Sequence, residues 1–213
     1  MIFGKIEYLN LLPFHVFMKR YGASQHYSQI SNYKTGVPSK INDAFLKRRV
    51  DAAFISSIKA KRHRYAPLGI IAKKEVLSVL LIPASTTRHD SASATSNILA
   101  QVLHVNGEVL IGDRALKYYL SGNSALDLAA VWHERYRLPF VFALLCYHSH
   151  RRYMQTMSRH FLKRRVRIPH YLLQQASQRT AIAPKDILHY LTYISYDLDT
   201  AAQRGLKKFL SLT

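Results

Sequence analysis

Small hydroxyl and amide side chains follow short hydrophobic runs at several places in this chain. Asn10 comes shortly after the run at residues 5–8, and Ser56 and Ser57 directly follow the run at residues 52–55. In open α/β folds the carboxyl ends of the strands form the crevice in which a ligand binds. Neutral donors and acceptors at that edge are suited to a small polar molecule. The sequence therefore predicts a small-molecule site.

A second group of hydroxyls stands at the start of an expected helix. Ser93, Thr95 and Ser96 lead into the apolar segment at residues 97–103. The first backbone N–H groups of a helix are unpaired, and together with the helix dipole they attract anions. A plain helix cap needs only one hydroxyl. The cluster therefore indicates either an anion-binding loop or simple capping, and both interpretations stay open.

At four positions, a possible chemical role has a structural alternative. Asn10 offers an amide donor and acceptor for a ligand, although Asn is also a good helix cap. Ser78 lies inside an apolar run, where a hydroxyl more commonly bonds to neighbouring backbone. Gly112 permits a tight turn or a close backbone approach. Asp113 could act as a catalytic base or cap the helix expected near Ala115.

Several classes of protein lack support in the sequence. The 11 histidines show no metal-ligand spacing, because His148 and His150 have no further partner and no His-Glu-x-x-His motif occurs. Walker, Gly-x-Gly-x-x-Gly and Gly-x-Ser-x-Gly motifs are also absent. The single Cys146 suits a buried apolar position and a reducing compartment. With no signal-peptide pattern and no apolar run long enough to cross a bilayer, a cytoplasmic protein without membrane association is expected.

The chain is strongly basic. Among its 213 residues, Lys and Arg outnumber Asp and Glu by 31 to 12, which gives a formal net charge of +19. Such an excess fits a solvated surface, steering of an anionic substrate, or a nucleic-acid groove. The basic residues are scattered and the 14 tyrosines are spread along the chain, so nucleic acid is the least favoured partner. With 48% hydrophobic residues, a packed core is expected.

The expected elements alternate between strands and helices and then become helices alone. Strands are expected at residues 5–8, 51–55, 76–82, 109–111 and 139–146, and helices at residues 11–20, 38–46, 96–103 and 126–136. After about His148 only helical stripes occur, one of them through Ile187, Leu191, Ile194 and Leu198. This order predicts an α/β fold of two lobes, as in periplasmic-binding proteins, with the ligand between them. The expected lobes are residues 1–76 with 144–213, and residues 77–143.

Taken in order, the motifs resemble one enzyme family. They are Tyr8-Leu9-Asn10-x-Leu-Pro13, Gly36-x-Pro38-Ser39-x-x-Asn42, Asp51 to Ser57, Val79-Leu80-Leu81, Ser93-x-Thr95-Ser96, Ile111-Gly112-Asp113-x-Ala115-Leu116, and Asp127-Leu128-x-x-x-Trp132 to Pro139-Phe140-Val141-Phe142-Ala143. This pattern resembles chorismate dehydratase, the first enzyme of the futalosine route to menaquinone. The resemblance covers roughly residues 2–146, and the C-terminal helices carry little of it.

The resemblance implies a fold, a reaction and a set of site residues. The fold is the two-lobed, type II periplasmic-binding-protein-like fold with a helical C-terminus. The reaction removes water from the substrate chorismate to give 3-[(1-carboxyvinyl)oxy]benzoate, with no metal and no organic cofactor. Catalytic roles fall on Asn10 and Ser78, and substrate-binding roles on Ser56, Ser57, Ser93, Thr95, Ser96, Gly112 and Asp113. Neutral donors can hold two carboxylates and stabilise a carbanion-like state, and a substrate carboxylate could itself be the base.

The chain departs from the family pattern at two places. The connection at residues 83–90 is short, which predicts a trimmed second lobe, and Arg137 stands where a glycine is common. Three alternatives remain: a non-catalytic small-anion-binding protein of the same fold, a nucleic-acid-binding protein, and a sister enzyme acting on a later menaquinone intermediate. The absence of an export signal argues against the first alternative. The Ser-x-Thr-Ser and Ile-Gly-Asp pattern favours the dehydratase over the third.

Overall fold

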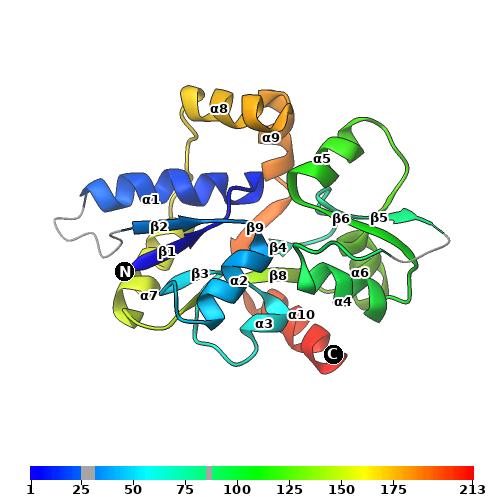
Figure 1. The fold of residues 1–213 in the computed structure, drawn as a ribbon, viewed down its shortest axis with the longest axis horizontal. Helices are drawn as coiled ribbons and strands as arrows, with labels where there is room; N and C mark the ends of the chain where they lie inside the picture. Colours follow the sequence, from blue (N-terminus) through cyan, green and yellow to red (C-terminus); the bar gives the residue numbers. More distant parts are fainter. Residues whose placement is uncertain (25–31, 85–87) are drawn as a thin grey trace.

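The computed structural model describes residues 1–24, 32–84 and 88–213, which form two β-sheets with helices packed around them (Figure 1). The strands are β1 (Ile2–Lys5), β2 (Asn32–Thr35), β3 (Ala52–Ser56), β4 (Tyr65–Ala72), β5 (Val79–Pro83), β6 (Gly107–Ile111), β7 (Leu126–Asp127), β8 (Phe140–Tyr147) and β9 (Ile194–Asp197). The helices are the 3₁₀ turn η1 (Leu9–Leu11), then α1 (Leu12–Ser24), α2 (Pro38–Leu46), α3 (Ser57–Ala60), α4 (Ala94–Val102), α5 (Gly112–Leu120), α6 (Leu128–Tyr136), α7 (Arg151–Leu162), α8 (His170–Thr180), α9 (Pro184–Leu191) and α10 (Thr200–Ser211).

The larger sheet has the strand order β2-β1-β3-β8-β4-β9, and the smaller sheet has the order β6-β5-β7. In the larger sheet β1 is parallel to β2 and β3, whereas β8 runs antiparallel to β3 and β4. The smaller sheet lies with α4, α5 and α6 on one side of the molecule in Figure 1. The chain passes between the sheets twice, after β4 and before β8. The predicted boundary at residue 144 therefore falls inside β8, which pairs with the larger sheet from Phe140 onward.

The larger sheet is covered on both faces, as expected from its apolar strands. Every residue of β3 is buried, which requires packing on each side of the sheet. Along β1, Phe3 stacks on Phe14 of α1, and the next residue, Gly4, faces Ile41 of α2. Because successive strand residues point to opposite faces, α1 and α2 lie on opposite sides of the sheet. The aromatic core continues from Phe14 to Phe54 and Phe161.

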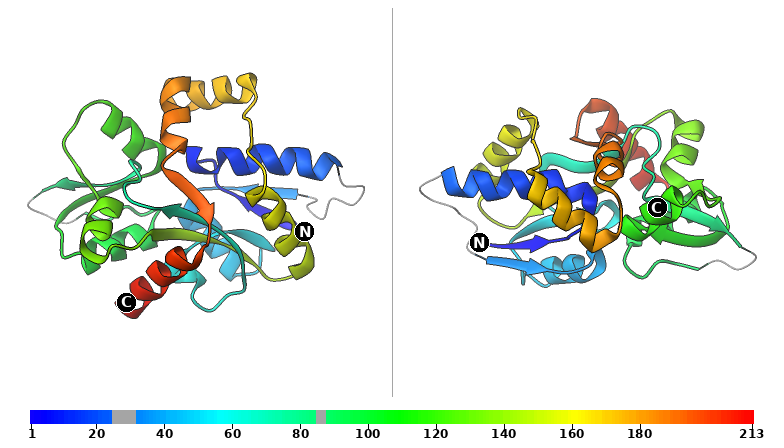
Figure 2. Two further views of the ribbon diagram at one scale, coloured as in Figure 1. Left: turned by 180° about the vertical axis from the view of Figure 1, so that it is seen from behind. Right: turned by 90° about the horizontal axis from the view of Figure 1, so that it is seen from above.

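The C-terminal region is helical, as predicted, but it contains one strand that the pattern missed. The prediction of a continuous helical stripe through Ile194 and Leu198 is wrong, because α9 ends at Leu191 and residues 194–197 form β9. Tyr193, Ile194 and Tyr196 are residue types that favour strands. Pairing with β4, in which Ile194 lies opposite Ala72, places them at the edge of the larger sheet. Figure 2 shows this strand leading from α9 back under the helices toward α10.

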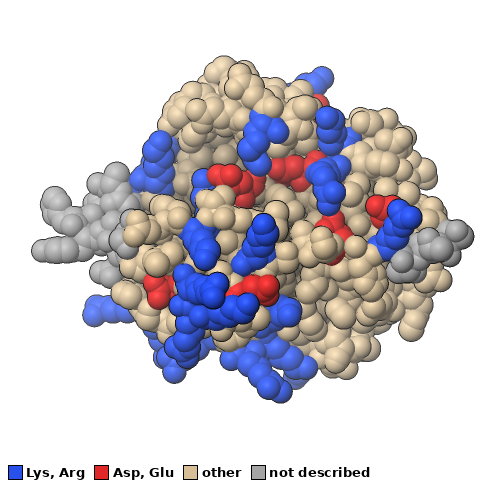
Figure 3. All heavy atoms as spheres, viewed as in Figure 1, with Lys and Arg blue, Asp and Glu red and all other residues tan. Residues whose placement is uncertain are grey.

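One group of exposed basic residues lies at the end of the larger sheet that faces away from the smaller sheet. Figure 3 shows Lys and Arg side chains gathered in the lower part of the view, around α2 and α3. Exposed basic residues in the turns and at the start of α7 at that end are Lys47, Arg48, Arg49, Lys61, Arg62, Arg64, Arg151 and Arg152. These turns adjoin the start of β3 at Ala52, whereas the carboxyl end of β3 is Ser56. The polar residues predicted to bind substrate therefore lie at the opposite end of the sheet from this basic surface.

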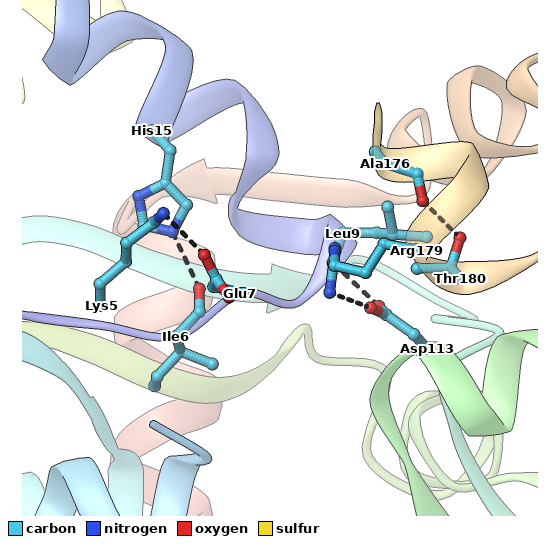
Figure 4. A network of polar contacts seen from close by, with 9 residues as sticks. All are labelled: Lys5, Ile6, Glu7, Leu9, His15, Asp113, Ala176, Arg179 and Thr180. Atoms are coloured by element: carbon cyan, nitrogen blue, oxygen red, sulfur yellow. Dashed lines mark hydrogen bonds and ion pairs between the residues drawn. The ribbon is translucent and has the colours of Figure 1, made fainter. Parts of the chain in front are cut away.

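A buried polar contact fixes the chain between β1 and α1. The Nε2 of His15 donates a hydrogen bond to the carbonyl of Ile6 at 2.8 Å, beside the Lys5–Glu7 ion pair (Figure 4). Burial lowers the pKa of His15 to about 4 from its ordinary value of 6.5. The neutral imidazole is therefore the form that the folded protein accommodates.

This histidine makes stability fall in mild acid. Because folding lowers the pKa of His15, the contribution of this residue to the free energy of unfolding is complete above pH 6.5 and is lost as the pH falls toward 4. Between pH 7.5 and 5.5 we expect a loss of about 1.4 kcal/mol from this group. The variant His15→Gln, which keeps a donor for Ile6, should lose less stability over the same interval. Urea unfolding at the two pH values measures this, with the exposed His170→Gln as control. An unchanged pH dependence in His15→Gln would contradict the assignment.

Candidate active site

A cavity of about 80 Å³ lies between the two sheets, and its polar lining consists mainly of Asn and Ser side chains. Its polar lining residues are Tyr8, Asn10, Ser56, Ser78, Ser93 and Ser96, joined by Gly112 and by apolar side chains such as Leu11, Phe54, Val79, Ile111 and Phe142. These residues come from η1, β3, the crossing segment before β5, α4 and α5. None of the described lining residues is Lys, Arg, His, Asp or Glu. The cavity can therefore bind a ligand only through neutral donors, backbone dipoles and apolar contact.

The structure divides the predicted site residues into two groups. Those lining the cavity are Asn10, Ser56, Ser78, Ser93, Ser96 and Gly112. The others, Ser57, Thr95 and Asp113, are not among the lining residues and make contacts that hold the lobes or the sheet. The Ser57 hydroxyl donates to the carbonyl of Val141, and the Thr95 hydroxyl accepts the N–H of Ile58 at 3.4 Å.

Ser56 is held at the end of β3 by an asparagine of α2. The Nδ2 of Asn42 donates to the Ser56 hydroxyl at 2.7 Å, and the Oδ1 of Asn42 accepts the Ser56 N–H at 3.1 Å. The amide thus uses both its donor and its acceptor on one residue. Asn42 stood in one of the sequence motifs but had no assigned role, and its buried position is what the pattern could not show.

Ser93 and Ser96 organise the start of α4. The Ser93 hydroxyl accepts the N–H of Ser96 at 3.1 Å and donates to the Ser96 hydroxyl at 2.8 Å. Because Ser93 supplies the hydrogen of that second bond, the hydrogen of the Ser96 hydroxyl remains available to a ligand. The positive end of the α4 dipole lies behind it. The structure shows the capping role of Ser93, and both serines also line the cavity. Anion binding by this cluster stays a prediction.

Gly112 allows a tyrosine to close the cavity wall. Gly112 has a φ of +67°, and a Cβ there would lie 2.7 Å from the ring of Tyr8. Only glycine combines that backbone conformation with such a close contact. Burial, followed by the charges of Asp90 and Asp113, raises the pKa of Tyr8 to about 12. The phenol therefore keeps its proton and can serve as a neutral donor, a role that the sequence analysis missed.

Asp113 connects the smaller lobe to the larger one. Its carboxylate accepts the N–H of Leu9 at 2.9 Å and forms an ion pair with Arg179 of α8 at 3.2 Å (Figure 4). Burial raises the pKa of Asp113 despite these two partners. In this conformation the carboxylate is occupied in holding η1, the element that carries Asn10.

Ser78 stands at the end of the first crossing segment, on a constrained backbone. The preceding residue, Leu77, has a φ of +60°, an uncommon conformation for a branched side chain. The carboxylate of Asp127 accepts the N–H groups of Val76 and Leu77 at 2.8 and 2.7 Å, and it also caps α6 through Ala129 and Ala130. Burial raises the pKa of Asp127, while these backbone bonds oppose the change. One carboxylate thus fixes the position of Ser78.

Asn10 lies within η1 and does not cap α1. The cap of η1 is Tyr8, and the Asn10 carbonyl accepts the hydroxyl hydrogen of Tyr196 at 2.7 Å. Asn10 lines the cavity together with Ser93 and Ser96. The capping alternative is therefore not what the structure contains.

A larger open groove of about 670 Å³ lies between α1 and α8, with Lys5, Lys19 and Arg179 on its walls. It shares Tyr8 with the interlobe cavity but contains none of the predicted site residues among its described lining. We take the smaller cavity as the candidate site, because it is where the carboxyl ends of strands and the helix starts converge.

The described parts of the chain offer neither a cluster of metal-ligating side chains nor a membrane-spanning helix. No group of three or more His, Cys, Asp or Glu side chains there is placed to hold a metal ion. No described helix is both long and apolar enough to span a bilayer. Cys146 is buried, and burial raises the pKa of its thiol to about 12.

Solved structures show which fold class this is. A protein from Archaeoglobus fulgidus matches with a TM-score of 0.68 at 15% identity, covering 99% of this chain and 95% of its own. The periplasmic aliphatic sulphonate binding protein of Escherichia coli matches with a TM-score of 0.60 at 11% identity, covering 100% and 90%. The predicted two-lobed, periplasmic-binding-protein-like fold is therefore confirmed.

Sequence comparison then places the chain within a family. The model of the menaquinone biosynthesis family matches residues 1–108 and 96–213, so the chain belongs to that family. A chorismate dehydratase of Campylobacter jejuni is 45% identical over 215 residues, covering 99% of this chain and 96% of that protein. A chorismate dehydratase of Thermus thermophilus is 24% identical, covering 98% and 93%. The C-terminal helices, which carried little of the sequence resemblance, are included in these matches.

The double role of Asp127 predicts a large loss of stability on its removal. Asp127→Ala should lower the free energy of unfolding by about 3 kcal/mol, since it removes a helix cap and leaves two further backbone N–H groups unpaired. Asp199→Ala is the matched control, because Asp199 caps α10 through a single bond to Ala202. We expect about 1 kcal/mol there. Urea unfolding measures both, and equal losses would contradict the bracing role of Asp127.

Proposed function

We propose that this protein is a chorismate dehydratase, a carbon–oxygen lyase that removes water from chorismate to give 3-[(1-carboxyvinyl)oxy]benzoate. The observation that carries the proposal is the 45% identity to a chorismate dehydratase along nearly the whole chain. The chemistry of the interlobe cavity supports it independently. A cavity lined by Asn10, Ser78, Ser93 and Ser96 offers neutral hydrogen-bond donors for a small oxygen-rich anion.

The reaction needs little beyond orientation and hydrogen bonding. A proton leaves the ring carbon that bears the enolpyruvyl ether, and the bond between the adjacent ring carbon and its hydroxyl breaks. The departing hydroxide takes up a proton and leaves as water. The product ring is aromatic, which supplies a strong driving force. The protein must hold two carboxylates, stabilise negative charge as the proton leaves, and hydrogen-bond the departing hydroxyl. A substrate carboxylate, held by the protein, can act as the base.

We assign roles by where each side chain lies. The start of α4, with Ser93 and Ser96, binds a carboxylate, aided by the positive end of the helix dipole. Ser56, held by Asn42, contributes from the larger lobe. Asn10 and Ser78 act at the ring, where they orient the substrate and hydrogen-bond the departing hydroxyl.

The substrate reaches this cavity only if the lobes open. The cavity of about 80 Å³ is smaller than the roughly 300 Å³ at which typical ligand sites begin. We assign the opening to the two crossing segments, residues 73–78 and 137–139, so that the larger sheet and the smaller sheet move as separate units with the helices packed on them. Closure on the substrate would exclude water from the reacting atoms.

The first test is turnover. Purified protein incubated with chorismate should form a product lighter by one water, with the absorbance of a benzoate ring, without an added cofactor. Unchanged chorismate in the presence of folded protein would reject the dehydratase. Tight binding of chorismate without turnover would then favour an anion-binding protein, and absence of binding would favour a sister enzyme with a different substrate.

The role of Asn10 is tested by removing its amide. Asn10→Ala should lower kcat by about a hundredfold or more, as expected when a donor to the developing charge is lost. Its thermal midpoint should stay close to that of the unmodified protein. Asn123→Ala, at an exposed asparagine in the turn after α5, is the matched control and should be fully active. Near-normal turnover by Asn10→Ala would reject its catalytic role.

A further inference from the structure

One tyrosine from the C-terminal helices contacts both proposed catalytic side chains. Tyr190 belongs to α9 and is only 2% exposed. Its hydroxyl lies 2.8 Å from the hydroxyl of Ser78. The side chain of Asn10 is close enough to lower the pKa of this phenol, as a hydrogen-bond donor does. Asn10 and Ser78 come from separate elements, η1 and the segment before β5, so Tyr190 is a physical link between them.

We propose that Tyr190 is a positioning residue of the active site, whose hydroxyl sets the direction of the hydrogen bonds that Ser78 and Asn10 offer to the substrate. The proposal rests on the function assigned above and adds a residue to it. Tyr190 lies behind the cavity and not among its lining residues, so it acts through its two partners.

The direction follows from counting hydrogens. A phenol has one hydrogen to donate, a serine hydroxyl also has one, and an amide has a separate donor and acceptor. If Tyr190 donates to the Oδ1 of Asn10, it accepts from Ser78, and the cavity then meets serine lone pairs and amide hydrogens. If Tyr190 donates to Ser78, it accepts one of the two amide hydrogens of Asn10, and the cavity meets the serine hydrogen, the second amide hydrogen and the amide oxygen. The second arrangement agrees with the effect of Asn10 on Tyr190, because a donor to the phenol oxygen lowers its pKa. The direction of the Tyr190 hydroxyl thus decides whether Ser78 offers the substrate a hydrogen or a lone pair.

The surroundings keep this phenol in the form the link requires. Burial is the main effect that raises the pKa of Tyr190 above its ordinary value, and the carboxylates of Asp113 and Asp127 act in the same direction. The hydroxyl therefore stays protonated and neutral at physiological pH. Tyr196, which lies in β9, also holds Asn10 in place by donating to its carbonyl at 2.7 Å.

A second feature argues against a purely space-filling role. A phenylalanine would fill the same volume without a polar group. Burying a hydroxyl without a hydrogen-bond partner costs folding free energy, so a buried tyrosine is favoured only where its hydroxyl is paired. Here both hydroxyl partners are the residues assigned to chemistry. By contrast, the hydroxyl of Tyr153 is buried with no hydrogen-bond partner among the described residues.

The test is Tyr190→Phe, with steady-state turnover of chorismate as the readout. We expect kcat to fall about 10- to 100-fold while KM changes less than about threefold, since Ser78 and Asn10 remain but are no longer oriented. A merely structural role would move both constants or neither. Tyr153→Phe is the matched control, which removes a buried hydroxyl away from the site and should leave both constants unchanged.

Each outcome separates this proposal from the proposed function. If the unmodified protein does not turn over chorismate, the function itself fails. If it does, and Tyr190→Phe has normal kcat or a changed KM alone, the positioning role is overturned. Should Tyr190→Phe fail to fold, 3-fluorotyrosine at position 190 keeps the ring and hydroxyl but makes a stronger donor. An altered kcat in that protein would support the proposal, and an unchanged kcat would overturn it.

Discussion

The carboxylate of Asp127 is the constraint on which the site depends. The chain must leave the larger sheet, turn sharply and enter the smaller one, and at that turn Leu77 adopts a left-handed conformation. Four backbone N–H groups, two from the crossing segment and two from the start of α6, point at this one carboxylate. Strained backbone of this kind persists only where its surroundings over-determine it, and it is common at functional sites. Ser78 follows directly and so has one position available to it.

The rest of the site is assembled around that point by parts of the chain that are distant in sequence. Asn42 orients Ser56, Ser93 orients Ser96, and Tyr190 joins Ser78 to Asn10. Each predicted active group is thus held by a buried neutral partner. No charged side chain lines the described cavity, although the protein carries a net charge of +19. Binding of an anion there rests on helix starts and oriented hydroxyls, and the surface charge contributes only at long range.

The sequence contained the fold and the main features of the site for specific reasons. An apolar run followed by Ser places Ser56 at the end of β3, as predicted. Asn10, in the turn after β1, and Ser78, just before β5, line the same cavity although neither ends a strand. The positioning roles of Asn42 and Tyr190 could not be predicted, because both residues lie in helices whose sequence patterns indicate only packing. Asp127 was part of a motif, but its hydrogen bond to the N–H of Leu77, 50 residues away in the sequence, is visible only in the folded structure. Strand β9 was missed because Ile194 also fits helical spacing, and only pairing with β4 decides between the two.

The most direct test of this account is the crystal structure of the Ser78→Ala variant with chorismate bound. The account predicts chorismate between the lobes, with a carboxylate on the start of α4 at Ser93 and Ser96 and the ring hydroxyl beside residue 78 and Asn10. Chorismate seated instead in the groove between α1 and α8, with its carboxylates on Lys5 and Arg179, would contradict it.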